Sequence, residues 1–132
     1  VFTAEGCAQT GRSYAADVDP QGWRTGAVLT LPNEDTLAKY DLELFLRCND
    51  RFAEDTLTLR VETITPDSLR YGEFFCIPFP QTHTPAAVAR EAKQLYRRRV
   101  LFGQRGNYRL ILTPTRPVRG VVAVGATLQQ TP

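Results

Sequence analysis

The side chains that could carry out acid–base or nucleophilic chemistry are few in this sequence. His83 is the only histidine, and it lies between Thr82 and Thr84 in a proline-containing segment. A hydrolase would hold such a base beside a nucleophile, and the G-x-S-x-G sequence typical of many hydrolases is absent. A loop histidine next to the start of a helix is the simpler explanation, so His83 is not predicted to be catalytic.

Carboxylates could serve glycoside hydrolysis, which needs two of them beside one bond. Asp41 and Glu43 alternate along the solvent face of an expected strand. Asp50, Glu54 and Asp55 lie in the polar segment that follows it. Acids in such positions are normally solvated, so the sequence predicts no catalytic residue and a protein that is not an enzyme.

The three cysteines, Cys7, Cys48 and Cys76, are too few for a disulfide scaffold and too widely spaced for a zinc site. With one histidine available as a nitrogen ligand, neither a metal nor another cofactor is expected. Cys48 and Cys76 fall on apolar strands, which favours two buried thiols. A disulfide between them is the alternative, and it would require neighbouring strands with Cα atoms under about 7 Å apart.

Charge is unevenly distributed along the chain. Residues 1–66 carry six basic and eleven acidic side chains, whereas residues 67–132 carry ten and three. Fourteen of the sixteen basic residues are arginines, which hold carboxylates through two parallel hydrogen bonds. Such a skew indicates either fixed ion pairs on a sheet surface or an anionic partner.

The densest basic feature is the run Arg97–Arg99, whose first and third side chains would share one face of a strand. Arg109 would join them if the two strands that contain these residues pair. Nucleic-acid binding requires interleaved exposed aromatic residues and a strongly basic domain, whereas the isoelectric point is only about 8.6. We expect ion pairs with Asp41, Glu43 or Glu62, no nucleic-acid partner, and contact with anionic lipid head groups as the alternative.

The elements that must position these residues are mainly strands, because apolar and polar side chains alternate along most of the 132 residues. No segment reaches the ~18 consecutive apolar residues of a membrane-spanning helix. Strands are expected over 27–31, 39–48, 56–64, 69–77, 96–102, 107–113 and 121–128. Polar turns predict two antiparallel hairpins, one joining 39–48 to 56–64 and one joining 96–102 to 107–113.

One segment departs from this alternation. Thr84 and Pro85 are typical of a helix start, and a short helix is expected from Ala86 to Gln94. Many short strands separated by turns favour an all-β fold, namely an antiparallel β-sandwich with one short helix. Residues 1–13 would form an N-terminal tether, and residues 14–132 a single β-sandwich domain.

Aromatic side chains suggest a second kind of function. A platform on which a sugar ring stacks could be built from Trp23, Tyr71, Phe74, Phe75 and Phe79. Aromatic residues at alternating strand positions more often belong to the core. A carbohydrate-binding β-sandwich module at the cell surface is therefore the alternative function, and exposure of Trp23 and Tyr71 would favour it.

The order of several short motifs resembles one known family. In chain order, these motifs are Trp23, Tyr40-x-Leu42-x-Leu44-x-Leu46-Arg47, Phe52, Thr56-Leu57-x-Leu59-x-Val61, Thr65-Pro66-Asp67, Phe102, Gly106-x-Tyr108 and Gly120-Val121-x-x-Val124-Gly125-x-x-Leu128. From Tyr14 to Leu128, this succession is similar to the gliding-motility lipoproteins of the GldH family of Bacteroidota. The chain departs from the family at Phe52, where tyrosine is favoured, and at Phe74–Pro80, which replaces a glycine-rich stretch.

The resemblance implies an exported protein that is attached to lipid through an N-terminal cysteine. Cys7, preceded by the small residue Gly6, is the candidate lipid-attachment residue. The family implies a place in the cell envelope, on the periplasmic or outer-membrane side, with the lipid anchor as the only link to the membrane. The implied role is non-enzymatic protein–protein contact in gliding motility or in the associated envelope secretion machinery, whose proteins would be the partners.

Overall fold

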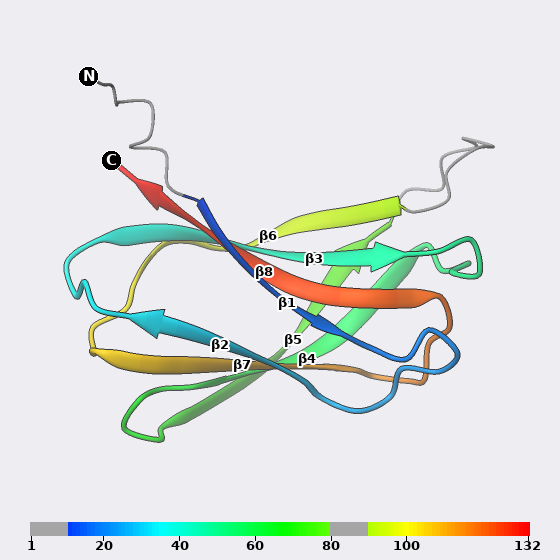
Figure 1. Cartoon of the computed structure of the whole chain (residues 1–132), viewed down its shortest axis with the longest axis horizontal. Coiled ribbons are helices and arrows are strands. Elements are labelled where there is room, and N and C mark those ends of the chain that lie inside the picture. Colours follow the sequence, from blue (N-terminus) through cyan, green and yellow to red (C-terminus); the bar gives the residue numbers. More distant parts are fainter. Residues whose placement is uncertain (1–10, 80–89) are drawn as a thin grey trace.

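Two antiparallel four-stranded sheets pack face to face in the computed structural model, which describes residues 11–79 and 90–132 (Figure 1). The strands are β1 (Gly11–Asp17), β2 (Ala27–Asn33), β3 (Lys39–Cys48), β4 (Thr56–Ile64), β5 (Arg70–Pro78), β6 (Arg90–Leu101), β7 (Gly106–Pro114) and β8 (Val121–Thr131). One sheet has the order β1-β8-β3-β6 and the other the order β2-β7-β4-β5. The β-sandwich predicted from the alternation is confirmed, and the described ranges contain no helix.

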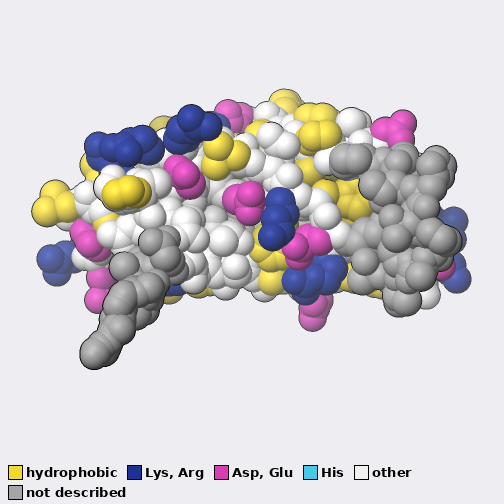
Figure 2. All heavy atoms as spheres, turned by 90° about the horizontal axis from the view of Figure 1, so that it is seen from above, with side chains coloured by type: hydrophobic (Ala, Val, Ile, Leu, Met, Phe, Trp, Pro, Cys, Tyr) yellow, Lys and Arg dark blue, Asp and Glu magenta, His cyan; other side chains and the backbone are white. Residues whose placement is uncertain are grey.

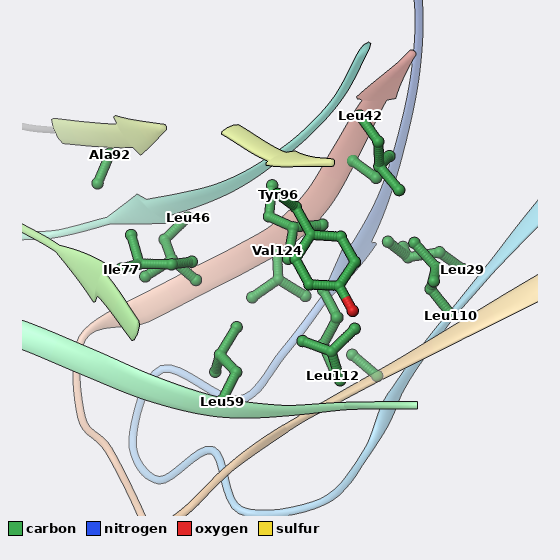
Figure 3. Close-up of a cluster of buried hydrophobic side chains, with 14 of the residues drawn as sticks. Leu29, Leu42, Leu46, Leu59, Ile77, Ala92, Tyr96, Leu110, Leu112 and Val124 are labelled. Carbon is green, nitrogen blue, oxygen red and sulfur yellow. The ribbon is translucent and has the colours of Figure 1, made fainter. Parts of the chain in front are cut away.

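The core lies between the two sheets, because the strands alternate in burial as their sequences predict. Leu42, Leu44 and Leu46 of β3 are buried, and so are Leu57 and Leu59 of β4. Figure 3 shows buried side chains from both sheets meeting in this interior. Each such leucine contributes about 1.5–3 kcal/mol relative to an exposed one, so this shared core holds the sheets together.

Both predicted hairpins are wrong, because the chain passes from one sheet to the other at these turns. β3 pairs with β6 and β8, whereas β4 pairs with β5 and β7. Likewise, β6 and β7 belong to different sheets, so Arg109 on β7 does not join the arginines of β6. Among the eight described strands, β4 and β5 are the only consecutive pair within one sheet. Alternation determines which side chains are buried, but it suits a hairpin and a crossing between sheets equally well.

The crossing from β3 to β4 is closed by Phe52, a buried side chain whose ring meets Phe79 edge-on with centroids 4.6 Å apart. Asn49 donates its backbone N–H to the carbonyl oxygen of Gly120 at 2.8 Å. Gly120 has a φ of 89°, and a Cβ there would overlap the backbone of Phe52. Glycine is therefore required where the β7–β8 loop packs against this crossing.

The predicted helix Ala86–Gln94 begins outside the described residues, and its part from Arg90 onward is wrong. These residues form the start of β6, where they pair with β3 and bury Ala92 in the core. Helix propensities differ among ordinary residues by less than about 1 kcal/mol. Pairing with a central strand therefore outweighs them.

β1 is an element that the sequence did not predict. It pairs with β8 along its whole length, and the hydroxyls of Ser13 and Thr127 lie 2.9 Å apart across the two strands. Within β1, Tyr14 and Ala16 are the side chains that pack partly against the core, so the apolar alternation of this strand is weak. Because β1 begins at Gly11, the sheet starts within the segment 1–13 that was expected to be a tether.

Gly125 interrupts the apolar pattern of β8, which predicts either a bulge or a close approach of another group. The structure shows a close approach. A Cβ at this position would overlap both the ring of Phe45 and the carbonyl oxygen of Tyr14. Phe45 pairs with Gly125 across the sheet, and its ring is buried over the glycine on the outer face.

Candidate functional site: a cleft between two sheet edges

A cleft of about 380 Å³ opens where β5, at the edge of one sheet, faces β6, at the edge of the other. Its wall is mainly apolar and comes from both sheets; the principal apolar residues are Leu31, Leu42, Tyr96, Val100, Phe102 and Leu110. The edges of β5 and β6 are not hydrogen-bonded to each other, since the strands belong to different sheets. Small-molecule sites typically enclose about 300–1,000 Å³, so the cleft is large enough for a small ligand.

A register shift in β6 turns Tyr96 toward this cleft. The β3 residues Leu42 and Glu43 pair with Arg97 and Leu95, respectively. Tyr96 is therefore skipped in the pairing and forms a bulge, which redirects its side chain. The Tyr96 ring is buried, and Figure 3 shows it pointing from β6 into the space between the sheets.

A second register shift involves Arg98 and Arg99, and Asp41 holds it in place. Arg99 has a φ of 54°, which residues other than glycine rarely adopt. A carboxylate oxygen of Asp41 accepts the backbone N–H of Arg99 at 2.9 Å. The bulge breaks the alternation on which the predicted common face of Arg97 and Arg99 depended.

The two sheet edges are joined beside the cleft by the carboxylate of Glu73 on β5. This carboxylate accepts hydrogen bonds from the Tyr96 hydroxyl and from the Arg97 guanidinium. The guanidinium lies 4.3 Å from the centre of the Tyr96 ring, and the Phe75 ring meets Tyr96 edge-on at 4.9 Å. Burial raises the pKa of Tyr96, which keeps its hydroxyl protonated and able to donate. We call Glu73, Tyr96 and Arg97 the Glu73 cluster.

The ion pairs predicted for the arginine run are wrong in their partners. Arg97 pairs with Glu73 rather than with Asp41, Glu43 or Glu62. Glu62 instead pairs with Arg70 on the neighbouring strand, at 3.0 Å between carboxylate and guanidinium. The prediction placed these acids across one sheet from Arg97. Asp41 and Glu43 do lie on β3, beside the Arg97 partner Leu42, but the guanidinium of Arg97 reaches β5 of the other sheet instead.

β6 carries two further exposed arginines, Arg98 and Arg99, between the cleft-lining residues Arg97 and Val100, and we call these two the cationic rim. Both lie in the β6 bulge opposite Asp41. Figure 2 shows basic and acidic side chains interspersed over one face of the molecule. The rim therefore favours anions near the cleft, most strongly at low salt.

β5 presents its other side to solvent, and we call Gly72, Phe74 and Cys76 the outer face of β5. Phe74 is a large apolar side chain that is 65% exposed, and it pairs with Arg60 on β4. Among the described strands, none pairs with the second edge of β5. An exposed aromatic side chain beside an unpaired strand edge is a surface on which another chain can dock.

The two cysteines in the described residues lie in different environments. Cys48 is buried as predicted, whereas the prediction for Cys76 is wrong, because this residue lies on the outer face of β5 and is exposed. The two are on strands of different sheets, and no disulfide joins them. Cys7, the candidate lipid-attachment residue, lies outside the described residues.

The aromatic residues do not form the platform that a sugar site would need. Trp23 is 2% exposed, and its indole N–H donates to the carbonyl oxygen of Thr25 at 2.7 Å. Tyr71 is 59% exposed and lines the cleft, whereas Phe74 is on the opposite face of the same strand. One of the two residues whose exposure would favour carbohydrate binding is therefore in the core.

The residues considered for catalysis are not gathered at this cleft. His83 lies outside the described residues. Asp41 holds the β6 bulge, and Glu54 pairs with Arg116. In residues 11–79 and 90–132, no group of three or more His, Cys, Asp or Glu side chains could hold a metal ion. The described ranges also contain no candidate for a membrane-spanning helix.

Sequence reasoning missed the Glu73 cluster. Glu73 and Tyr96 are 23 positions apart, and they meet only because β5 and β6 are edges of stacked sheets. The available signal was a single acid within an aromatic-rich strand. The arrangement suits binding, because it combines an apolar cavity, one fixed carboxylate and several cations.

Comparison of the chain with known protein families, with curated proteins and with solved structures finds no match.

Proposed function

We propose that this chain is a non-enzymatic protein of the bacterial cell envelope that acts by protein–protein contact, as its resemblance to the GldH lipoproteins suggests. Its partners would be envelope proteins of the motility or secretion machinery. It would be held at the membrane by a lipid on Cys7, on the periplasmic or outer-membrane side. The observation that carries the proposal is Phe74, which is exposed to 65% on an edge strand.

The outer face of β5 has the composition of a contact surface. Aromatic residues and arginine are enriched at protein interfaces, and here Phe74 pairs with Arg60 across two strands. The second edge of β5 can also accept a strand of a partner, whose backbone would then extend the sheet. When a partner covers a large apolar side chain that was exposed to water, the free energy falls, and this favours binding.

The carbohydrate-binding alternative has weaker support. Trp23 is buried, and Tyr71 and Phe74 point to opposite sides of β5, so a sugar ring would meet one aromatic face at most. The geometry therefore favours contact with a protein.

Site-specific photocrosslinking in the native organism tests the contact. The photoreactive residue p-benzoylphenylalanine is placed at position 74 or, as a control, at position 28. Val28 is a matched control because it is 51% exposed on β2, the opposite edge strand of the same sheet. We expect one envelope protein to be crosslinked from position 74 and not from position 28, and we expect Phe74→Glu, but not Val28→Glu, to abolish its co-purification. Equal crosslinking from both positions, or none from position 74, would contradict the proposal.

The lipid anchor is tested separately. Cells grown with an alkyne analogue of palmitate should incorporate the label into the wild-type protein and not into a Cys7→Ser variant. If the wild-type protein is not labelled, the lipid anchor on Cys7 is refuted, whereas the contact through Phe74 is still decided by the crosslinking experiment.

A further inference from the structure

We propose that the cleft between β5 and β6 binds a single-chain anionic amphiphile, with the hydrocarbon chain among the apolar side chains and the head group at the cationic rim. This inference goes beyond the proposed protein contact. The cleft is reached from the inner side of β5, whereas the contact uses Phe74 on the outer face. Either proposal can fail without the other.

The wall of the cleft suits a hydrocarbon chain. Leu42 and Val100 come from one sheet and Leu110 from the other, and the rings of Phe102 and Tyr108 lie 4.7 Å apart between them. Such a wall offers dispersion contacts on several sides and few hydrogen-bond partners. At about 380 Å³, the cleft lies in the usual range of small-molecule sites and has room for an alkyl chain of medium length.

The polar groups at the opening favour an anionic head group. Among the described residues, Glu73 has the only carboxylate that lines the cleft, and it already accepts hydrogen bonds from Tyr96 and Arg97. Arg97 also lines the cleft, and its side chain is 47% exposed. Of its five N–H donors, one bonds to Glu73 and one to the carbonyl oxygen of Tyr96, which leaves donors for a ligand. The cationic rim adds further positive charge, and Glu62, the nearby acid on β4, pairs with Arg70. A carboxylate or phosphate monoester head group would therefore be attracted, and a quaternary ammonium repelled.

Isothermal titration calorimetry with sodium hexanoate, octanoate, decanoate and dodecanoate tests the chain, each ligand below its critical micelle concentration at pH 8. Because each buried methylene adds a nearly constant free energy, we expect affinity to rise about fourfold per CH₂ and to level off once the cleft is full. Decyltrimethylammonium should bind at least tenfold more weakly than decanoate, and added salt should weaken decanoate binding. Affinity that does not depend on chain length, or equal binding of the cation, would overturn the proposal.

Two neighbouring positions provide matched variants. Val100 lines the cleft, whereas Leu101 is next to it in the chain and is exposed. Val100→Trp should fill the cleft and remove decanoate binding, and Leu101→Trp should leave it unchanged. If Val100→Trp does not fold, Tyr71→Ala replaces it, because Tyr71 lines the cleft and is largely exposed. Tyr71→Ala should weaken binding at least about threefold and Phe74→Ala should not. Decanoate affinity that is the same in the cleft variant and its control would overturn the proposal.

A vesicle experiment distinguishes a free anionic amphiphile from the anionic head groups of a bilayer. Free decanoate is the committed ligand, and phosphatidylglycerol vesicles present anionic head groups whose chains are held in a bilayer. The proposal is supported if the protein binds decanoate and if Arg98→Glu weakens this binding by about two- to fivefold. Binding to vesicles without binding to decanoate would assign the cationic rim to a membrane surface and overturn it.

Discussion

Removal of the Tyr96 hydroxyl tests whether the Glu73 cluster holds the two sheet edges together. Tyr96→Phe deletes the donor to Glu73 and keeps the aromatic ring. Hydrogen bonds to charged groups contribute about 1.5–3 kcal/mol in mutational series. The Glu73 side chain is 41% exposed and keeps Arg97 as a partner, which lowers the cost of the loss. We therefore expect the free energy of unfolding to fall by about 1–2 kcal/mol.

The assay is urea unfolding of the wild type and the variant at a series of pH values from 8 upward. Burial raises the pKa of Tyr96 in the folded protein, so folding favours the protonated phenol. Its contribution to stability is complete below the unfolded value of about 10 and is lost as the pH rises toward the folded pKa. The difference between wild type and Tyr96→Phe should therefore be constant near pH 8–9 and narrow above pH 10.

A matched control is Tyr71→Phe, because Tyr71 is largely exposed; its stability should stay within about 0.5 kcal/mol of the wild type. The reasoning would be refuted if Tyr96→Phe were as stable as the wild type, or if its deficit were the same at every pH. A double-mutant cycle with Glu73→Gln should give a coupling energy of about 0.5–1.5 kcal/mol. A coupling energy of zero would mean that the two side chains do not stabilise the fold through their hydrogen bond.

Three further predictions concern the sandwich itself. Gly125→Ala should lower the free energy of unfolding by about 1–3 kcal/mol, because the new methyl group overlaps an aromatic ring; an unchanged thermal midpoint would contradict this. Leu59→Ala should cost about 2–5 kcal/mol in urea unfolding, since this side chain is fully buried, whereas Leu37→Ala should cost under about 0.5 kcal/mol; equal losses in the two variants would contradict their placement inside and outside the core. Iodoacetamide should alkylate Cys76 in the folded protein long before Cys48, as peptide mapping by mass spectrometry can show, and the reverse order would contradict the assignment of faces.

The strands of this fold were predictable from local sequence, and their partners were not. The expected bounds of β3 and β4 agree with the structure, because one apolar side chain in two is a direct consequence of burial on one face. The same alternation is compatible with a hairpin and with a crossing between stacked sheets. Phe52 shows the difference: in a hairpin loop it would be exposed, whereas here it is buried at the crossing.

The candidate site was less predictable, since it depends on the pairing of strands distant in sequence. Tyr96 reaches the cleft only through a bulge, and the neighbouring bulge needs Asp41, more than fifty residues earlier, to hold Arg99 at a positive φ. No local pattern marks such an irregularity. β1 was missed for a related reason: most of its side chains are exposed, so it lacks the alternation that reveals the other strands.

Nuclear magnetic resonance with isotope-labelled protein and decanoate tests the central claim, that the open edge between β5 and β6 is a binding site. Backbone amide signals of Tyr71, Arg97, Val100 and Leu110 should shift progressively with ligand concentration and saturate together. Signals of Val28, on the opposite edge strand, should not move. Shifts spread over both outer faces, or no shift at the cleft residues when decanoate is in large excess, would contradict the claim.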